Sequence, residues 1–583
     1  MEIYRGIGVS PGLVIGTALV LDAEGVRIPA RQIPPEKVSS ELTRLNKALK
    51  AAAEESRAQQ KSVELRLGKQ LGSIFSAQST FYDDPGLLTE LHQLIHNERF
   101  TAEYAVTNVI RTYRRALEAL GKDHFLSTKA SDLLDVEKRI LNQLLGADWE
   151  PLSNLKEPVI VLAHDISPSE TATMDPTKVL AFATESGGKT SHTAIMAGAL
   201  EIPAVVGLGK FLHDVAGGDT LIVDGTRGIL IVDPDEEILE EYQGQVKVLS
   251  EQSGYWLAER DLPAVTLDGT RIELMGNIEF PSEAAHCIDR NADGVGLYRT
   301  EFLFAGHDTD PSEEEHYQAY VHVVQTLGPN KPVVIRTLDH GADKFPNHAE
   351  KISEERNPFL GLRSVRLCLR NLPMFKKQMR AILRASVQGD IRIMFPMVGT
   401  LLELRQCKML LAEVREDLLE EGIPFKKDMP VGTMIEVPSA AIMADKLAKE
   451  VDFFSLGTND LVQYTLAADR TNENVAGLYN PADPAVLRLI DSVVRAARTN
   501  NIGATVCGEM SGDPLFTQWL LGTGLRQLSV SPQNIPEIKK LIRRINLSDA
   551  EAMAEKALQL DTARDVTNYL REQKRRIQPD AID

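Results

Sequence analysis

Cysteine is scarce in this chain of 583 residues: there are four, Cys287, Cys368, Cys407 and Cys507, and no two of them form a CxxC motif. Scattered cysteines without disulfide or zinc spacing are typical of proteins from a reducing compartment. Long apolar runs are missing too, because stretches such as residues 12–21 fall well short of the ~20 residues that a membrane-spanning helix needs. The opening residues MEIYRGIGVSPG contain no signal-peptide core. We therefore expect a soluble cytoplasmic protein without disulfides.

Basic clusters interleaved with aromatic residues are also absent. The chain has 64 basic and 83 acidic residues, a formal net charge of -19, and aromatic residues make up 5% of it. This balance argues against nucleic acid as a partner and stays compatible with a basic protein partner. The length predicts roughly three or four domains.

Strand-like runs occur in two separate parts of the first 235 residues. Residues 1–22 alternate apolar and small side chains. Short apolar runs return at 159–163, 179–184, 204–206, 220–223 and 229–232, separated by Gly, Pro and Asp turns. We expect all of them to pair in one α/β domain, made of residues 1–22 plus 146–235.

The segment between these two parts has a helical pattern. Residues 23–145 carry few glycines after about residue 36 and many Ala, Leu, Glu and Lys at three- and four-residue spacing. This pattern predicts an inserted bundle of amphipathic helices. Residues 236–260 read as a linking helix.

Residues 261–583 alternate strands with helices. Eight strand-like runs begin near residues 272, 294, 332, 390, 430, 451, 504 and 527. About 250 residues with eight such units predict a (β/α)8 TIM-type barrel, with a doubly wound open sheet as the alternative. The polar residues at the C-terminal ends of the runs are Asn277, Arg299, Arg336, Asp339, Glu436, Asn459, Asp460 and Cys507. Because this end of a barrel is its catalytic rim, their placement favours the barrel.

His192 lies in the heptad Gly-Gly-Lys-Thr-Ser-His-Thr, residues 187–193. The glycines predict a sharp turn, and the hydroxyl residues are plausible caps of an apolar helix behind it. Backbone N–H groups at a helix start stabilise an added phosphoryl group, and a neutral imidazole is a competent phosphate acceptor. The alternative is a histidine that only caps the helix. The heptad is not a P-loop, because Ala183 occupies the position of the first glycine.

Four arginines lie at strand ends or in the loops beyond them: Arg299, Arg336, Arg363 and Arg470. Guanidinium groups bind planar carboxylates and phosphates bidentately, so converging arginines predict a small substrate with several negative charges. Each arginine taken alone is more often part of an ordinary surface ion pair. Lys344, in DHGADKF, can add positive charge nearby.

Two carboxylates and a thiol complete the predicted rim. Glu436 in MIEVP and Asp460 in GTNDL stand at neighbouring strand ends, a geometry that suits Mg²⁺. Cys507 follows an apolar run, which predicts a thiol at the rim rather than in the packed interior. Such a thiol can donate a proton to a carbanion or enolate, or act as a nucleophile. The other three cysteines are expected to be buried and inert.

Five motifs, GGKTSHT, GVGLYRTEFLF, NPFLGLR, FFSLGTNDLVQYTLAADR and VCGEMSGD, occur in this order, and the chain resembles enzyme I of the phosphoenolpyruvate:sugar phosphotransferase system up to about residue 545. The resemblance implies that His192 takes the phosphoryl group of phosphoenolpyruvate and passes it to a histidine of the phosphocarrier HPr. It implies that Glu436 and Asp460 hold Mg²⁺, that Cys507 protonates the enolate to pyruvate, and that Thr171 hydrogen-bonds the active histidine. It assigns substrate binding to Arg299, Arg336, Arg363, Asn459, Arg470 and Lys344.

In this family the helical insertion docks HPr, the barrel forms a homodimer, and the histidine domain swings between two sites. The chain departs from the family pattern at Gly198 and Lys189, where arginines are usual, and at Ser76 and Gln78 in the insertion.

Two other interpretations stay open. A dikinase, such as pyruvate phosphate dikinase or phosphoenolpyruvate synthase, shares the carrier histidine and the barrel, but needs an ATP-grasp domain that the helical segment is too short to provide. A degenerate regulatory phosphocarrier would fit Gly198 and the altered insertion, whereas the full set of barrel residues argues against it.

Overall fold

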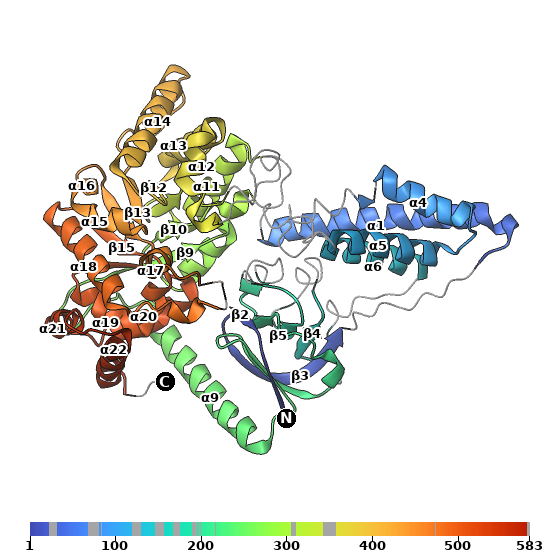
Figure 1. Cartoon of the computed structure of the whole chain (residues 1–583), viewed down its shortest axis with the longest axis horizontal. Coiled ribbons are helices and arrows are strands. Elements are labelled where there is room, and N and C mark those ends of the chain that lie inside the picture. The colour runs from blue at the N-terminus through green and yellow to red at the C-terminus, as the bar shows by residue number, and fades with distance from the viewer. Residues whose placement is uncertain are drawn as a thin grey trace. The chain divides into compact units, whose positions relative to one another are not determined.

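The structure is a computed structural model that describes most of the chain. The residues outside its description are 22–31, 68–80, 83, 119–129, 146–154, 156, 167–174, 176, 189–193, 195–196, 199, 216, 305–309, 342–356, 471, 473 and 580–583. The chain forms two units, Met1–Gln252 and Ser253–Asp583 (Figure 1). The first unit contains a sheet and a helical bundle, and the second contains a barrel.

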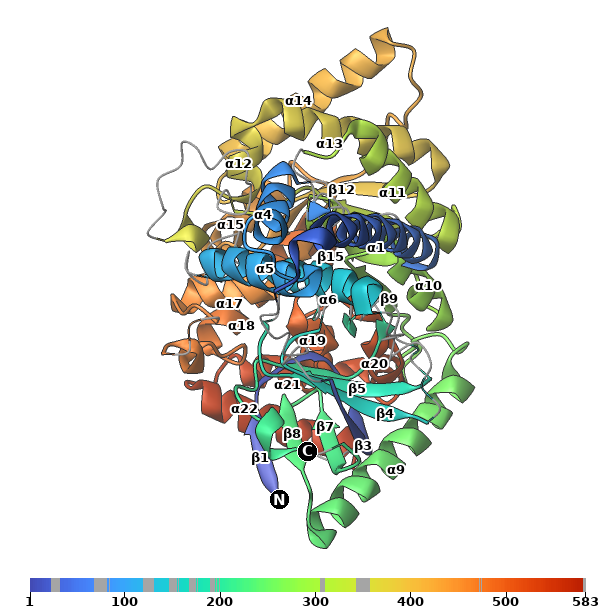
Figure 2. The same cartoon turned by 90° about the vertical axis from the view of Figure 1, so that its right-hand side faces the viewer.

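The sheet of the first unit has eight short strands. They are β1 (Glu2–Arg5), β2 (Ile7–Ser10), β3 (Leu13–Leu21), β4 (Val159–Ala163), β5 (Val179–Thr184), β6 (Ala204–Val206), β7 (Thr220–Asp224) and β8 (Ile229–Val232). Their order across the sheet is β1-β8-β7-β3-β4-β5-β6-β2, and Figure 2 labels six of these strands, β1, β3, β4, β5, β7 and β8. Because β3 pairs with both β4 and β7, the N-terminal segment joins the later strands, as its apolar pattern predicted.

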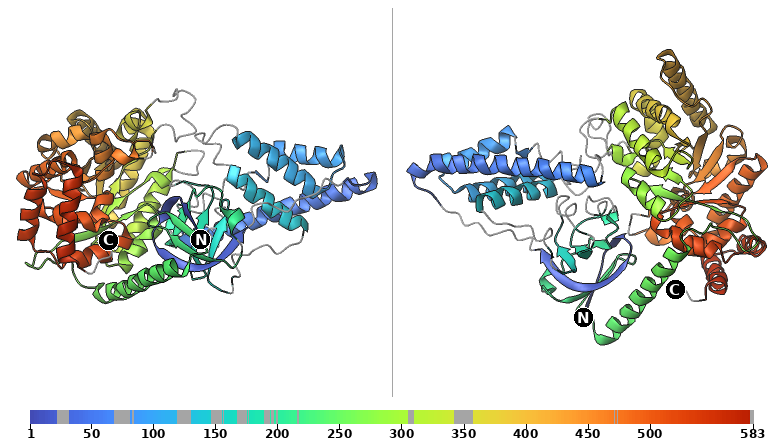
Figure 3. Two further views of the ribbon diagram at one scale, coloured as in Figure 1. Left: turned by 60° about the horizontal axis from the view of Figure 1, so that its bottom comes forward. Right: turned by 180° about the vertical axis from the view of Figure 1, so that it is seen from behind.

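The described helices of the bundle are α1 (Val38–Leu67), α4 (Pro85–His96), α5 (Ala102–Glu118) and α6 (Ala130–Leu145), which lie lengthwise beside one another (Figure 3). Their apolar stripes meet in a core in which Leu45, Leu91 and Ile140 are fully buried. Helix α4 begins at Pro85 because the Asp84 side chain accepts a hydrogen bond from the Leu87 N–H at 2.8 Å. The predicted helical insertion is therefore present.

The second unit is a closed barrel of eight parallel strands. They are β9 (Glu273–Ile278), β10 (Val295–Tyr298), β11 (Val333–Arg336), β12 (Ile391–Phe395), β13 (Val431–Ile435), β14 (Phe453–Leu456), β15 (Gly503–Val506) and β16 (Gln527–Val530). Strand β16 pairs with β9, with Gln527 opposite Glu273, which closes the sheet and excludes the open alternative. Each strand starts within a few residues of its predicted position.

Helices surround the barrel (Figure 1). Helix α9 (Glu236–Glu259) passes from the first unit into the second; the others are α10 (Ala284–Asp289), α11 (Glu313–Leu327), α12 (Ser364–Arg370), α13 (Leu372–Ala385), α14 (Leu401–Glu420), α15 (Pro438–Ile442), α16 (Ala444–Leu447), α17 (Thr458–Leu466), α18 (Pro484–Thr499), α19 (Pro514–Gly522), α20 (Ile535–Ile542), α21 (Leu547–Ala557) and α22 (Ala563–Ile577). Trp519, Tyr320 and Phe375 are fully buried in the core of this unit. Within the described part of the chain, no helix combines the length and apolarity that crossing a membrane requires.

Inside the barrel, a layer of apolar side chains fills the centre. The layer consists of Leu297, Val334, Met394, Met434 and Cys507, with Phe453 packed against it. The Phe453 ring fits because Gly432 faces it: a Cβ on Gly432 would lie 2.3 Å from ring atoms. This apolar layer lies below the rim at the C-terminal ends of the strands.

Candidate active site

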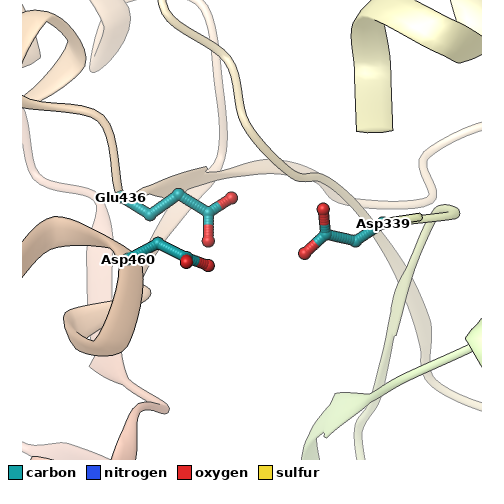
Figure 4. Close-up of side chains that lie close together, drawn as sticks. All are labelled: Asp339, Glu436 and Asp460. Carbon is teal, nitrogen blue, oxygen red and sulfur yellow. The ribbon is translucent and has the colours of Figure 1, made fainter. Parts of the chain in front are cut away.

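Three carboxylates meet at the C-terminal rim of the barrel. Glu436 directly follows β13, Asp460 lies in the first turn of α17 after β14, and Asp339 lies just beyond β11. One oxygen of each lies within 4.8 Å of the others, and the three groups point toward a common space (Figure 4). The structure thus brings together the two carboxylates that the sequence predicts as metal ligands, and it adds Asp339.

The three carboxylates do not share one electrostatic environment. Burial, followed by the charges of Asp339 and Asp460, raises the pKa of Glu436 well above its usual range. Burial and the charge of Asp339 also raise the pKa of Asp460. For Asp339, burial acts upward as well, but Arg336 and Arg363 outweigh it, so its pKa is lowered. The ionised forms of Glu436 and Asp460 are therefore disfavoured beside the ionised Asp339. A divalent cation bound here would relieve the repulsion between these carboxylates.

The donor set fits a hard divalent cation. Glu436 is 1% exposed, and its Oε1 accepts a hydrogen bond from the Met397 N–H at 2.5 Å, which fixes the carboxylate. Asp339 is already engaged, because its two oxygens lie 2.9 Å from Arg336 Nη1 and 3.4 Å from Arg363 Nη2. Glu436 and Asp460 are therefore the better donors, and Asp339 mainly contributes charge.

All four arginines that the sequence predicts to bind substrate have acidic partners. Arg336 Nη2 lies 3.0 Å from Glu301 Oε1, in addition to its contact with Asp339. Arg470 Nη1 lies 3.0 Å from Glu509 Oε1, and Arg299 pairs with Glu279. Asn459 belongs to the same network, because its Nδ2 donates to Glu509 Oε1 at 3.1 Å and its Oδ1 accepts from the Glu509 N–H at 2.8 Å.

The acids of this network outnumber its arginines. The carboxylates are Glu279, Glu301, Asp339, Glu436, Asp460 and Glu509, which face Arg299, Arg336, Arg363 and Arg470. The described side chains therefore attract an anion poorly by charge alone, and one divalent cation would balance the difference.

Three of these acids were not identified from the sequence, although a regularity pointed to them. Glu279, Glu301 and Glu509 each lie two residues beyond a strand-end residue that was identified, namely Asn277, Arg299 and Cys507. Glu279 and Glu301 pair with arginines at the end of the next strand, Arg299 and Arg336, and Glu509 pairs with Arg470 in the loop after α17. The spacing is visible in the sequence, but the pairing requires the closed barrel.

Arg336→Met should lower the free energy of unfolding by about 3–5 kcal/mol, because it leaves the buried Glu301 and Asp339 without a shared cation. The Arg336 side chain is 10% exposed and those of its partners 9% and 4%. Urea unfolding followed by tryptophan fluorescence measures the change. Arg470→Met is the control: its ion pair is 39% and 72% exposed, so we expect a loss below about 1 kcal/mol. Equal losses in the two variants would contradict the buried network.

The expectation that the Cys507 thiol stands at the rim outside the packed interior is wrong. Cys507 is 2% exposed and packs in the apolar layer of the barrel. Its Sγ accepts a hydrogen bond from Ser455 Oγ at 3.1 Å and donates to the Leu456 carbonyl oxygen at 3.5 Å. A residue directly after a strand can still point inward, which its position in the sequence does not reveal. Burial raises the pKa of Cys507 to about 11, so the thiol is protonated at neutral pH. The other cysteines are buried and free, as predicted.

Three predicted site residues, His192, Thr171 and Lys344, lie outside the described residues, as do Lys189, Ser76 and Gln78. Gly198 is described, and among the described residues no heavy atom lies within 4 Å of the place where its Cβ would be. The described part of the chain therefore leaves room for a side chain at the position of the family's usual arginine.

Comparisons with known proteins cover almost the whole chain. Residues 254–547 match the PEP-binding domain of PEP-utilising enzymes, residues 5–128 their N-terminal domain, and residues 155–228 their mobile domain. The phosphoenolpyruvate-protein phosphotransferase of Geobacillus stearothermophilus is 41% identical over 567 residues, which cover 97% of this chain and 97% of that protein. The Enterococcus faecalis protein of the same name is 41% identical, with 97% and 98% covered. That of Bacillus subtilis is 39% identical, with 98% and 100% covered.

Proposed function

The chain belongs to the phosphoenolpyruvate-protein phosphotransferases, and on that basis we propose how its residues move a phosphoryl group from phosphoenolpyruvate to a phosphocarrier protein. Phosphoenolpyruvate binds at the barrel rim, His192 accepts its phosphoryl group, and pyruvate leaves. The phosphohistidine then passes the group to a histidine of the carrier, for which we propose HPr. This transfer is the first step of the sugar phosphotransferase system.

The observation that carries the proposal is the meeting of Glu436 and Asp460 with Arg336 and Arg363 near a buried, protonated thiol. Phosphoenolpyruvate bears a phosphate and a carboxylate on a small carbon frame. Guanidiniums and a divalent cation bind both groups, and a proton donor completes the conversion of the enolate to pyruvate. The cation ligands and guanidiniums lie at the rim, and the thiol lies in the apolar layer below it.

Glu436 and Asp460 are the proposed ligands of a divalent cation, and Mg²⁺ is our choice because it combines few carboxylates with substrate oxygens. When bound, the cation neutralises negative charge on the phosphoryl and carboxylate oxygens of the substrate. The substrate oxygens are held by Arg299, Arg336, Arg363, Asn459, Arg470 and Lys344. The arginines exchange part of their contacts with rim acids for contacts with the substrate, so the rim acids keep the guanidiniums oriented before the substrate arrives.

The transfer itself uses three residues. The neutral imidazole of His192 attacks phosphorus, the bond from phosphorus to the enolate oxygen breaks, and Thr171 supports the imidazole by a hydrogen bond. The Cys507 S–H bond then breaks as its proton bonds to C3 of the enolate, which yields pyruvate and a thiolate.

We assign the phosphohistidine domain to residues 1–22 plus 146–235, HPr docking to 23–145, the linker to 236–260 and the phosphoenolpyruvate site to 261–583. A histidine that serves two partners in turn needs a mobile domain. A homodimer formed through the barrel and a cytoplasmic location complete the proposal.

Cys507→Ala should lower the rate of pyruvate formation by about 10²–10⁴-fold, because the enolate loses its proton donor. The wild-type protein, mixed with phosphoenolpyruvate and Mg²⁺, should release pyruvate and gain acid-labile, base-stable phosphate. Transfer from phosphorylated HPr back to His192 needs no enolate, so the variant should lose much less of it. Quenched-flow assays of both half-reactions measure the two rates.

The control is Cys407→Ala, which removes a buried thiol of α14 outside the barrel interior and should leave both half-reactions at the wild-type rate. If Cys507→Ala lost both half-reactions equally, or if Cys407→Ala showed the same losses as Cys507→Ala, Cys507 would not be the proton donor. A wild-type protein that forms neither pyruvate nor phosphohistidine would overturn the proposed function itself.

A further inference from the structure

We propose that Ser455 is a proton relay that restores the Cys507 thiol after each turnover, drawing the proton from water in a cavity at the N-terminal end of the barrel. The inference deepens the proposed function and rests on the role of Cys507 as proton donor to the enolate. It adds a residue and a direction of proton flow that the substrate site at the rim does not involve.

Ser455 stands between the thiol and the cavity. Its Oγ donates a hydrogen bond to Cys507 Sγ at 3.1 Å, and the residue is 1% exposed. Ser455 also lines the cavity inside the barrel. A hydroxyl group both donates and accepts hydrogen bonds, so it can pass one proton to sulfur while it takes another from water.

The cavity can hold water. Its volume is about 210 Å³, against roughly 30 Å³ for one water molecule in the liquid. Its lining runs from the exposed Asp452 and Gly503 at the starts of β14 and β15 to the buried Thr505, Ser455's neighbour across the strands. Thr505 Oγ1 donates to Gln527 Oε1 at 2.8 Å, and both residues line the cavity with Arg392. Polar groups therefore extend from the exposed end of the cavity to the relay.

A route for protons from the N-terminal end of the barrel is needed because other side chains surround the Cys507 thiol. The thiol is 2% exposed and packs against Leu297, Val334, Met394 and Met434. When phosphoenolpyruvate occupies the rim, the substrate covers the remaining approach. Ser455 is then the hydroxyl in contact with sulfur.

The proton balance closes without a further reagent. Transfer to the enolate breaks the S–H bond, forms a C–H bond and leaves a thiolate. The Ser455 O–H bond then breaks as a new S–H bond forms, and the serine oxygen takes a proton from a cavity water. Exchange with bulk water at the exposed end of the cavity neutralises the hydroxide that remains.

An isotope-exchange experiment with the full-length protein tests the relay. The protein is held with Mg²⁺, phosphoenolpyruvate and pyruvate at chemical equilibrium in ordinary water, with pyruvate carrying ¹³C in its carbon frame and deuterium on its methyl group. NMR follows movement of ¹³C into phosphoenolpyruvate and loss of methyl deuterium to solvent. The ratio of deuterium loss to carbon exchange reports how often the sulfur-bound proton reaches water in each cycle.

The wild-type ratio should lie near one deuterium lost per exchange of carbon. In Ser455→Ala we expect it to fall about 10-fold or more, because deuterium stays on sulfur and returns to the next enolate. Ser455→Thr keeps the hydroxyl and should restore the ratio. A merely structural defect would slow both exchanges together and leave their ratio unchanged.

The matched control is Ser386→Ala, which removes a fully buried hydroxyl that donates to the Leu383 carbonyl at 2.6 Å, away from the barrel interior. Its ratio should equal that of the wild type. An unchanged ratio in Ser455→Ala, or an equal fall in Ser386→Ala, would overturn the relay. No carbon exchange in the wild type would instead overturn the proposed function, so the two failures are distinct.

Discussion

Replacing Glu436 by glutamine should abolish phosphorylation from phosphoenolpyruvate, lowering the rate at saturating Mg²⁺ by about 10³-fold or more, since a cation that stabilises transferred charge contributes several kcal/mol. Glutamine keeps the length of the side chain and an oxygen for the Met397 N–H, which lies 2.5 Å from Glu436 Oε1. It removes the negative charge that a divalent cation would bind. Asp460→Asn should have the same effect. A coupled pyruvate assay measures the rate, and titration calorimetry with Mn²⁺ measures metal affinity.

The loss should not come from unfolding. Burial, Asp339 and Asp460 all disfavour the Glu436 anion, so without divalent cations the glutamine variant should be at least as stable as the wild type. Glu403→Gln is the control: Glu403 also accepts backbone N–H bonds, from Gly399 and Thr400 at 2.9 Å each, but it caps α14 outside the carboxylate cluster. Normal Mn²⁺ affinity and a normal rate in Glu436→Gln would mean that the cluster is not the metal site.

His192→Ala should remove phosphorylation of the chain completely, because the imidazole of His192 is the proposed acceptor of the phosphoryl group. Mass spectrometry after incubation with phosphoenolpyruvate and Mg²⁺ measures the modification. Phosphoenolpyruvate should still bind to the variant in calorimetry, since its proposed contacts belong to the barrel.

The control is His322→Ala, which replaces an exposed histidine on α11. This variant chain should become phosphorylated at the wild-type rate. Retained acid-labile phosphate in His192→Ala would assign the carrier to another residue. Loss of both phosphorylation and phosphoenolpyruvate binding would mean that the substitution disturbs the barrel and cannot identify the acceptor.

Much of the fold was accessible from the sequence. The eight strand starts of the barrel, the helical insertion and the return of the N-terminal segment to the later strands all followed from apolar spacing and turn residues. Closure did not follow, because the same alternation of strands and helices builds an open sheet. The pairing of Gln527 with Glu273 decides it, and those residues lie far apart in the chain.

The site divides in the same way. Strand-end position placed Glu436, Asp460, Arg336 and Asp339 on one rim, since parallel strands end at the same edge. It did not reveal that Asp339 faces the other two carboxylates, or that each rim arginine already has an acid. It also gave Cys507 the wrong environment.

The sequence by itself determined which segments are strand-rich and which are helical, which strand ends carry polar residues, and the resemblance of five motifs to one family, because each of these depends on spacing along the chain. Only the tertiary structure decided that the buried Cys507 thiol accepts a hydrogen bond from Ser455, and that a cavity extends to Ser455 from the N-terminal end of the barrel. It also decided that the carboxylates of Asp339, Glu436 and Asp460 lie close together. Burial and charge repulsion arise between residues that only barrel closure brings together, and these two effects set the pKa values on which the chemistry depends.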